Sequence, residues 1–247
     1  MIAPAPNKCS EVKMRLISIG DIHGQLEKLK TLLGIVRPTQ NDKLVFLGDY
    51  IDRGPDSKGV VDCLIELSGQ VPSIFLRGNH EQMMLDALAC DAPDRLPGWK
   101  RLADICTLWA METRHLKDSG MWLRNGAKTT MQSYGASQGK FPFQWDLIPQ
   151  EHVDFLAKSV LWHRENGFLF VHAGALENKP LENQIETLLW GRYSPPGEQE
   201  IHVVGHEVTP DGRPYFEPGR YNLDTGAGLD GPLTACDVLT KEIWQTS

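Results

Sequence analysis

The sequence lacks several features that would place it in a narrow class at once. None of its five cysteines forms a C-x-x-C pair, and their odd number and scattered positions indicate a reducing compartment rather than a disulfide framework. No apolar run approaches the roughly 18 residues of a membrane span, and no basic region followed by an apolar stretch opens the chain. We therefore expect a cytoplasmic protein with no membrane partner.

Positive charge is also scarce. The chain has 25 lysines and arginines against 32 aspartates and glutamates, which gives a net charge of −7, and no block of like charge stands apart. Because nonspecific binding to nucleic acid needs clustered positive charge, we expect no nucleic-acid partner. The length of 247 residues and the hydrophobic fraction of 41% are typical of a globular protein with a substantial core. No feature of the sequence indicates an oligomeric state.

What the sequence does contain is one pattern that occurs five times. A short apolar run, typical of a buried strand, ends in Asp, Asn or His beside a Gly. The runs span residues 15–19, 43–47, 73–76, 168–171 and 201–204, and helical patterns cover 25–36 and 81–89. This alternation predicts an α/β fold. Ligands of open α/β sheets collect beyond the carboxyl ends of the strands, so we expect the five polar loops to converge.

Two other regions differ from this pattern. Residues 86–158 form helical stretches interrupted by prolines and carry four tryptophans, namely Trp99, Trp109, Trp122 and Trp145. We interpret them as a helical cap inserted into a single domain that spans residues 1–247. Near the end, residues 222–225 and 234–244 show alternating polarity and predict a closing antiparallel hairpin.

The loop ends together form a candidate metal site. Two carboxylates, one amide oxygen and three imidazoles are ligands that suit Mn²⁺, Fe or Zn²⁺. Six ligands are too many for one catalytic ion with an open position, but they fit two divalent ions that share a carboxylate. We expect one ion to bind Asp21, His23 and Asp49, and the other to bind Asp49, Asn79, His172 and His206.

These residues predict phosphate ester hydrolysis. Two such ions lower the pKa of a bridging water, which provides a hydroxide for direct attack on phosphorus. The guanidinium groups of Arg53 and Arg77 match phosphate oxygens. His80, next to Asn79, is placed to protonate the leaving oxygen, and Asp52 is placed to hold its imidazole. We therefore predict a metal-dependent phosphomonoester hydrolase with His80 and Asp52 as its catalytic pair.

The same motifs carry a family resemblance. Asp-Ile-His-Gly at 21–24, Gly-Asp-Tyr-Ile-Asp-Arg-Gly at 48–54 and Arg-Gly-Asn-His-Glu at 77–81 resemble the signature of the PPP family of metallophosphatases, the serine/threonine protein phosphatases. With the segments at 172–174 and 205–206, the resemblance covers about residues 15–244. The Trp-Leu-Arg-Asn-Gly segment at 122–126 is most similar to the compact bacterial and phage branch.

This resemblance implies a calcineurin-like four-layer αββα sandwich with a dinuclear site at the edge of its two sheets. It implies Mn²⁺ as the metal most expected there, and it agrees with the six ligands and the catalytic pair given above. It also implies that Arg192, in Leu-Trp-Gly-Arg, is a second phosphate-binding arginine. Two roles remain open for Arg77. It either contacts the phosphate directly or supports the site residues without touching the phosphate.

Three functions compete at this point. The first is a protein serine/threonine phosphatase that acts on phosphorylated proteins or peptides, with phosphotyrosine as a further substrate. The second is a symmetrical diadenosine tetraphosphatase, whose relatives usually show Gly-Asn-His-Asp where this chain has Glu81 in the fourth position. The third is a non-catalytic metal-binding recognition module. The presence of all six ligands and of the acid favours catalysis, and Glu81 favours the first function.

Overall fold

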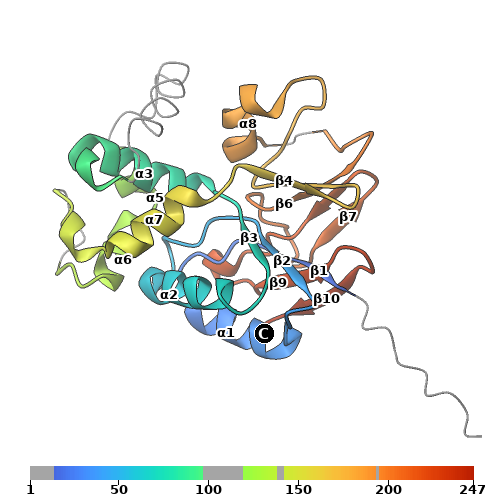
Figure 1. The fold of residues 1–247 in the computed structure, drawn as a ribbon, viewed down its shortest axis with the longest axis horizontal. Helices are drawn as coiled ribbons and strands as arrows, with labels where there is room; N and C mark the ends of the chain where they lie inside the picture. Colours follow the sequence, from blue (N-terminus) through green and yellow to red (C-terminus); the bar gives the residue numbers. More distant parts are fainter. Residues whose placement is uncertain (1–13, 97–118, 138–141, 193–194) are drawn as a thin grey trace, which may run out of the picture.

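The computed structural model describes residues 14–96, 119–137, 142–192 and 195–247. Two five-stranded sheets pack face to face at its centre (Figure 1). The first has the order β10-β9-β1-β2-β3, and the second has the order β4-β5-β6-β8-β7. The strands are β1 (Leu16–Ile19), β2 (Lys43–Phe46), β3 (Ser73–Phe75), β4 (Trp162–Glu165), β5 (Phe168–Val171), β6 (Ile201–Val204), β7 (Tyr215–Glu217), β8 (Arg220–Asn222), β9 (Thr234–Asp237) and β10 (Glu242–Gln245).

Three strands in each sheet run parallel and carry the site at one end. In the first sheet β1 pairs with β2, and β2 with β3, all parallel. In the second sheet β5, β6 and β8 are parallel neighbours. The five apolar runs expected to be strands are therefore β1, β2, β3, β5 and β6, which confirms that part of the prediction.

Residues of the central strands alternate between two cores. Along β2, Leu44 and Phe46 pack among the helices, whereas Val45 packs against the other sheet. Along β5, Phe168 and Phe170 face the first sheet, whereas Leu169 and Val171 face outward. Because both faces of each sheet are covered, an uninterrupted apolar run is what such a strand requires.

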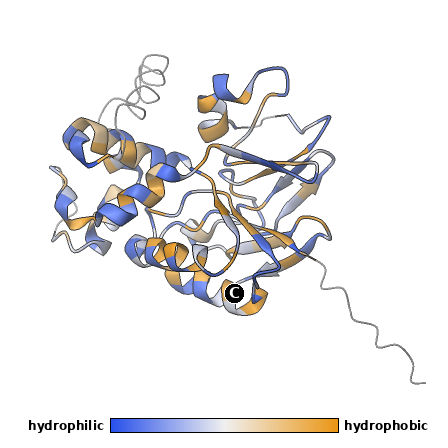
Figure 2. Ribbon diagram, viewed as in Figure 1, coloured by the Kyte–Doolittle hydropathy of each residue, from blue (hydrophilic) through white to orange (hydrophobic). Residues whose placement is uncertain are grey.

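Helices cover the outer faces of both sheets. The helices α1 (Leu26–Val36), α2 (Ser57–Ser68) and α3 (Asn79–Asp91) pack on the first sheet, and α8 (Ile185–Trp190) packs on the second. Hydrophilic and hydrophobic residues alternate along α2 (Figure 2), as in a helix with one buried face, whereas α3 is buried on almost all sides over its first ten residues. The fold is thus the four-layer αββα sandwich that the sequence predicted.

The segment 86–158 contains further helices beside α2 and α3 (Figure 1). They are α5 (Ser119–Asn125), α6 (Ala127–Ser133) and α7 (Gln150–Lys158), and we use the name helical insertion for the described residues between 119 and 158. A chain of hydrogen bonds that runs from the interior to the surface ties it to α2, because Tyr134 contacts His152 at 2.8 Å and His152 contacts Asp62 at 2.9 Å. Trp99 and Trp109 lie outside the described residues.

Short 3-10 turns occur within the described ranges at η1 (Pro93–Arg95), η2 (Trp145–Leu147), η3 (Leu181–Asn183) and η4 (Ala227–Leu229). None of the helices in those ranges is both long enough and apolar enough to cross a membrane.

The prediction of a closing hairpin between residues 222–225 and 234–244 is wrong, because these two segments do not pair with each other. Residues 220–222 form β8 in the second sheet, whereas residues 234–237 form β9 in the first. β9 instead turns back on β10, and the turn is closed by the backbone N–H of Lys241 donating to the carbonyl of Asp237 at 2.7 Å. Lys241 adopts a φ of 63° in this turn, a conformation more typical of glycine. The sequence therefore contains no glycine there that would have indicated the turn. The glycine-rich segment between β8 and β9 crosses from one sheet to the other.

Candidate metal centre

The loops that follow the parallel strands meet at one edge of the sandwich. Asp21 and His23 follow β1, Asp49 follows β2, and Asn79 opens α3 directly after β3. His172 follows β5 and His206 follows β6 in the second sheet. The carboxyl ends of parallel strands lie on the same side of a sheet, so the loops that follow them lie next to one another. The six side chains therefore form one cluster.

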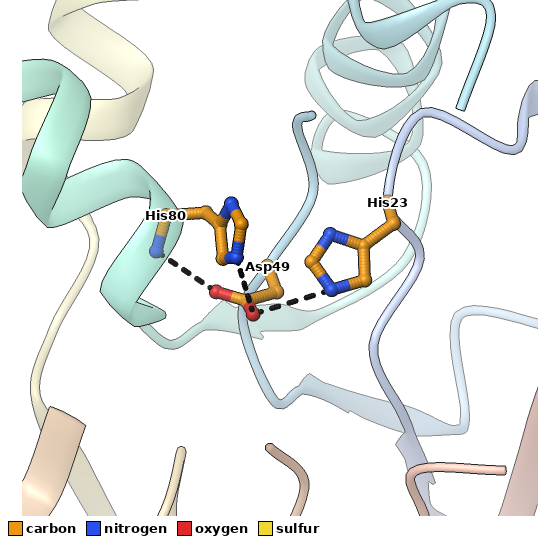
Figure 3. A group of neighbouring side chains, drawn as sticks. All are labelled: His23, Asp49 and His80. Carbon is orange, nitrogen blue, oxygen red and sulfur yellow. Dashed lines mark hydrogen bonds and ion pairs between the residues drawn. The ribbon is translucent and has the colours of Figure 1, made fainter. Parts of the chain in front are cut away.

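Asp49 lies at the centre of the cluster. Its Oδ2 is 3.4 Å from Nε2 of His23 and 3.9 Å from Nε2 of His80, and the carboxylate sits between the two rings (Figure 3). Its Oδ1 is 3.5 Å from Nε2 of His172 and accepts the backbone N–H of His80 at 3.1 Å. Asp49 thus belongs to two groups of potential metal ligands, one with His23 and His80 and one with His172 and His206.

Asn79 joins the second of these groups. Its Oδ1 is 2.9 Å from Nε2 of His172 and 3.1 Å from Nδ1 of His206. The amide oxygen, two imidazoles and Asp49 therefore surround one position, as expected for the second ion. Trp190 at the end of α8 packs edge-on against the His206 ring, with the ring centroids 6.1 Å apart.

Two histidines are fixed in the form that a metal ligand needs. Nδ1 of His23 is 3.0 Å from the carbonyl of Ile51, and Nδ1 of His172 is 2.9 Å from the carbonyl of Leu47. A carbonyl can only accept a hydrogen bond, so the proton lies on Nδ1 and the lone pair lies on Nε2. In both residues that lone pair faces Asp49.

Asp21 meets the cluster from the side of the second sheet. Its carboxylate accepts the backbone N–H of His206 at 3.0 Å, and Gly205 is needed beside it, since a Cβ there would lie 2.1 Å from Asp21 Oδ1. Burial first, and then the neighbouring Asp224 and Asp49 charges, raise the pKa of Asp21 well above its usual value.

Sequence reasoning missed Asp224, which follows a parallel strand as the other site residues do but does not match the pattern of an apolar run with an adjacent Gly. Asp224 follows β8, which is parallel to β6, and a Gly stands two residues later. Burial and the nearby Asp49 raise its pKa to about 6. The residue was overlooked because the segment was interpreted as one arm of a hairpin.

The backbone of the cluster is unusually constrained. His23, Asp49, Asp52, Arg53 and His206 all adopt left-handed conformations, with φ between 49° and 72°. Such conformations are uncommon outside glycine and cost of order 1–3 kcal/mol each when strained. They turn the side chains at the strand ends back toward one another.

Glu81, whose role the sequence did not reveal, holds the Asp49 loop. Its two carboxylate oxygens accept the backbone N–H groups of Gly78, Asp49 and Tyr50 at 2.8–2.9 Å. Burial and the Asp49 charge raise the pKa of this carboxyl to about 7. The first turn of α3 therefore fixes the loop after β2.

The charges of the cluster act on one another. Burial alone would raise the pKa of Asp49, but the histidines around it, with His172 and His80 foremost, bring it below its usual value. Burial lowers the pKa of His23 and that of His206 to about 3. The site thus combines an ionised central carboxylate with neutral imidazoles, which is the state in which both bind cations.

His80 has a second carboxylate partner. Its Nδ1 is 2.7 Å from Oδ2 of Asp52, which is fully buried. Burial lowers the pKa of His80, but the Asp49 charge and the hydrogen bond to Asp52 outweigh it, so the pKa ends above its usual value. The ring also packs edge-on against that of His23, with the centroids 4.7 Å apart.

The three candidate arginines lie in different surroundings. Arg53 is exposed, and its Nη2 is 3.4 Å from Nε2 of His80. Arg192 is exposed and close enough to His206 for its charge to help lower the pKa of that histidine. Arg77 is buried, and its guanidinium donates to the carbonyls of Ala157 and Ser159 at 2.8 and 3.1 Å.

The donors present fit divalent cations. Nε2 of His206 is buried and has no hydrogen-bond partner among the residues that the structure describes. The ligand atoms of each potential metal group lie within 4.8 Å of one another, and both groups share Asp49. Oxygen and imidazole ligands without a thiolate are the set that Mn²⁺, Fe and Zn²⁺ accept.

Comparison with known proteins identifies the family. The model of the calcineurin-like phosphoesterase family matches residues 14–228. The chain belongs to this family. Members of the family depend on two metal ions, in agreement with the ligand groups described above. The match extends from β1 to β8 and ends before β9 and β10.

Curated relatives match over shorter stretches. The chain is 50% identical over 72 residues to "Serine/threonine-protein phosphatase 1" of Salmonella typhimurium, which is 29% of this chain and 32% of the relative. It is 37% identical over 76 residues to "Bis(5'-nucleosyl)-tetraphosphatase PrpE [asymmetrical]" of Oceanobacillus iheyensis, which is 27% of this chain and 30% of the relative. Each match therefore spans only about a third of the relative's length.

Solved structures match over the whole fold. A crystal structure described as a putative diadenosine tetraphosphatase superposes with a TM-score of 0.61 at 21% identity and covers 96% of this chain and 94% of its own. A cold-active protein tyrosine phosphatase mutant gives a TM-score of 0.54 at 16% identity and covers 95% and 81%. At these identities the likeness concerns the fold.

Proposed function

We propose that this chain is a metal-dependent protein serine/threonine phosphatase. The observation that carries the proposal is the placement of Asp49 between two groups of metal ligands, with the His80–Asp52 pair directly beside it. Its support among relatives is the 50% identity to the Salmonella protein phosphatase, against 37% for the tetraphosphatase. Phosphotyrosine is proposed as a further substrate.

The proposed roles follow from the contacts. Two divalent ions, when held by the six ligands, supply the positive charge that binds phosphate oxygens and makes a water acidic enough to attack phosphorus. We assign Asp49 as the shared ligand, because both ligand groups include it. Mn²⁺ is the metal proposed, with Fe and Zn²⁺ as alternatives that these ligands also accept.

His80 is proposed as the general acid. Asp52 accepts the Nδ1 hydrogen, so the proton that can be given away is the one on Nε2, which faces Asp49 and Arg53. That proton passes to the leaving oxygen as the bond to phosphorus breaks. A carboxylate partner favours the imidazolium form, which is the form an acid must have.

The arginines divide into two roles. Arg53 is proposed to bind a phosphate oxygen because its exposed guanidinium reaches the edge of the cluster at His80. Arg192 is proposed as its counterpart on the side of His206. For Arg77 we propose a supporting role, since its guanidinium is engaged at the end of α7.

The second candidate is hydrolysis of a dinucleoside tetraphosphate, favoured by the names of one curated relative and one structural neighbour. The two functions share the same metal chemistry but differ in the bond cleaved. Against it stands Glu81, where such relatives usually have Asp.

One assay series separates the two. Metal-stripped protein is resupplied with Mn²⁺ and offered a phosphoserine peptide, a phosphothreonine peptide or diadenosine tetraphosphate at equal concentration. We expect release of phosphate from the peptides to exceed cleavage of the dinucleotide. His80→Asn, assayed in parallel, controls for contaminating phosphatases. Turnover of the dinucleotide alone would contradict the proposal.

We also propose a cytoplasmic location. Cys63 and Cys236 are thiols rather than disulfide partners, and burial raises the pKa of Cys236 to about 12, which keeps it protonated and unreactive. Expression of the chain with a C-terminal fluorescent tag, followed by cell fractionation, tests this location. Recovery in the membrane or periplasmic fraction would overturn it.

A further inference from the structure

Asp52 is held by more than its histidine partner. Nε1 of Trp122 donates to both of its carboxylate oxygens, at 2.9 Å to Oδ2 and 3.1 Å to Oδ1. The hydroxyl of Thr130 donates to Oδ1 at 2.6 Å. Trp122 lies on α5 and Thr130 on α6, so both donors come from the helical insertion and not from the motifs that carry the metal ligands.

The hydroxyl groups of Thr130 and Ser57 form a consistent chain of hydrogen bonds beside Asp52. The backbone N–H of Asp52 points at the oxygens of Thr130 and Ser57, at 2.9 and 3.0 Å. Those two hydroxyl oxygens are 3.0 Å apart. Because Thr130 gives its proton to Asp52, Ser57 is left to donate to Thr130, and each group then has the partner it needs. Asp52, Trp122 and Thr130 are all fully buried.

The turn between α5 and α6 packs directly against Asp52. Gly126 has a φ of 130°, and a Cβ at this position would lie 2.7 Å from Cβ of Asp52. No residue with a side chain could adopt this conformation so close to the carboxylate. The insertion is therefore shaped to bring its donors to Asp52.

These contacts determine what Asp52 can do for His80. A carboxylate that already accepts from Trp122 and Thr130 is held in one orientation and is kept as a pure acceptor. It must then accept from Nδ1 of His80, which leaves Nε2 as the only position on that ring for a transferable proton. Without the two donors the carboxylate could rotate away from the ring.

We propose that Trp122 and Thr130 are positioning residues for the general acid, and that the helical insertion thereby completes the catalytic site through Asp52. This inference rests on the proposed phosphomonoesterase function. Neither residue touches the substrate. Their effect falls on protonation of the leaving oxygen and not on metal binding or phosphate binding.

The chain offers a matched pair of variants. Trp122→Phe removes the indole donor but keeps an aromatic ring in contact with Phe143 and Trp145, whose ring centroids lie 4.9 and 5.6 Å away. Trp145→Phe is the control, because Trp145 belongs to the same aromatic cluster but donates to Asp91 instead of Asp52. Thr130→Val is a second variant that removes only the hydroxyl and keeps the shape.

The readout is the dependence of kcat on the leaving group. p-Nitrophenyl phosphate releases a stable anion that needs no proton, whereas a phosphoserine peptide releases an alkoxide that needs one. With Mn²⁺-loaded protein, we expect Trp122→Phe and Thr130→Val to lower kcat for the peptide roughly 10- to 100-fold, the usual value of a hydrogen bond to a charged group. The rate on p-nitrophenyl phosphate should stay within about threefold, KM and metal content should stay unchanged, and Trp145→Phe should behave as the wild type.

A second measurement tests whether the effect passes through His80. In the His80→Asn background, adding Trp122→Phe should cause no further loss on the peptide, since the group that it positions is already absent.

The outcomes distinguish the inference from the function on which it rests. If the wild-type protein hydrolyses neither monoester, the proposed function is wrong. If the wild type is active but Trp122→Phe and Thr130→Val lower both rates equally or leave both unchanged, the function stands and the positioning role is overturned. A further loss in the double variant would also overturn it.

Discussion

Asp49 and Asp52 lie three residues apart in one loop, yet two different regions of the molecule hold them. Asp49 is fixed by its immediate surroundings at the strand ends, where Glu81 binds its backbone and a Cβ on Gly78 would come within 2.1 Å of its carboxylate. Asp52 is fixed by Trp122 and Thr130, which are 70 and 78 residues farther along the chain. The proposed metal-binding half of the site thus lies at the strand ends, and the proposed acid half is completed by the helical insertion.

Because different regions hold Asp49 and Asp52, we expect that metal binding and proton transfer can be perturbed separately. A change at the strand ends should remove metal and activity together. A change in the insertion should leave the metals bound and act on proton transfer or on stability alone.

The largest effect is expected at Asp49. Asp49→Asn removes the charge of the ligand that both metal groups share, so both ions should be lost together and activity with them. Elemental analysis of Mn²⁺-loaded protein after gel filtration measures the metal content, and the fully exposed Asp146→Asn serves as a control. Loss of only one equivalent would show that Asp49 is not the shared ligand.

Substitution of His80 should lower activity without changing metal content. His80→Asn removes the proposed acid, and kcat on a phosphopeptide should fall roughly 10²- to 10⁴-fold. Metal content should remain that of the wild type, because His80 is not one of the six proposed ligands. A variant with full rate would exclude His80 from the mechanism, and a variant without metal would assign it as a ligand.

A smaller effect is expected where the insertion joins α2. Tyr134→Phe leaves Nδ1 of the buried His152 without its partner, which should lower the free energy of unfolding by about 1–2 kcal/mol. Denaturant unfolding measures the change, and Tyr215→Phe at an exposed position is the control. Metal content should not change. If it did, the insertion would also support the metal-binding half.

A stability effect of similar size, but confined to neutral pH, concerns an ion pair far from both halves. The hydrogen bond from Arg15, together with those from Thr39, lowers the pKa of Asp42 to about 2. Because the folded pKa lies below the unfolded value of about 3.9, this contribution is complete above pH 5 and is lost as the pH falls toward 2. Asp42→Asn should therefore cost about 1–2 kcal/mol of unfolding free energy at pH 7 and almost nothing near pH 2.

Denaturant unfolding at both pH values checks this expectation, again with Asp146→Asn as the control. Activity per folded molecule should be unaffected at pH 7. A cost that is the same at both pH values would mean that the pair with Arg15 does not stabilise the fold through the Asp42 charge.

The sequence by itself predicted five of the strands that the structure describes and the polar side chains that cluster at their ends. A buried strand that ends in a polar residue beside a glycine is a local signal, and it recurs at each ligand from Asp21 to His206. The parallel arrangement of such strands then requires their ends to meet, which is why the cluster could be predicted without coordinates. The pattern predicted only an α/β fold, and the four layers were implied by the family resemblance.

Only the tertiary structure decided which strands pair and which residues hold Asp52 in place. The hairpin was misassigned because local alternation does not say which sheet a strand joins, and Asp224 was overlooked with it. Trp122 opens the Trp-Leu-Arg-Asn-Gly segment noted in the sequence, but neither it nor Thr130 carries a local signal of a role beside Asp52, since a tryptophan or threonine on a helix is an ordinary core residue in sequence. Their contact with Asp52 exists only because α5 and α6 fold back on the loop after β2, and no spacing along the chain encodes that approach.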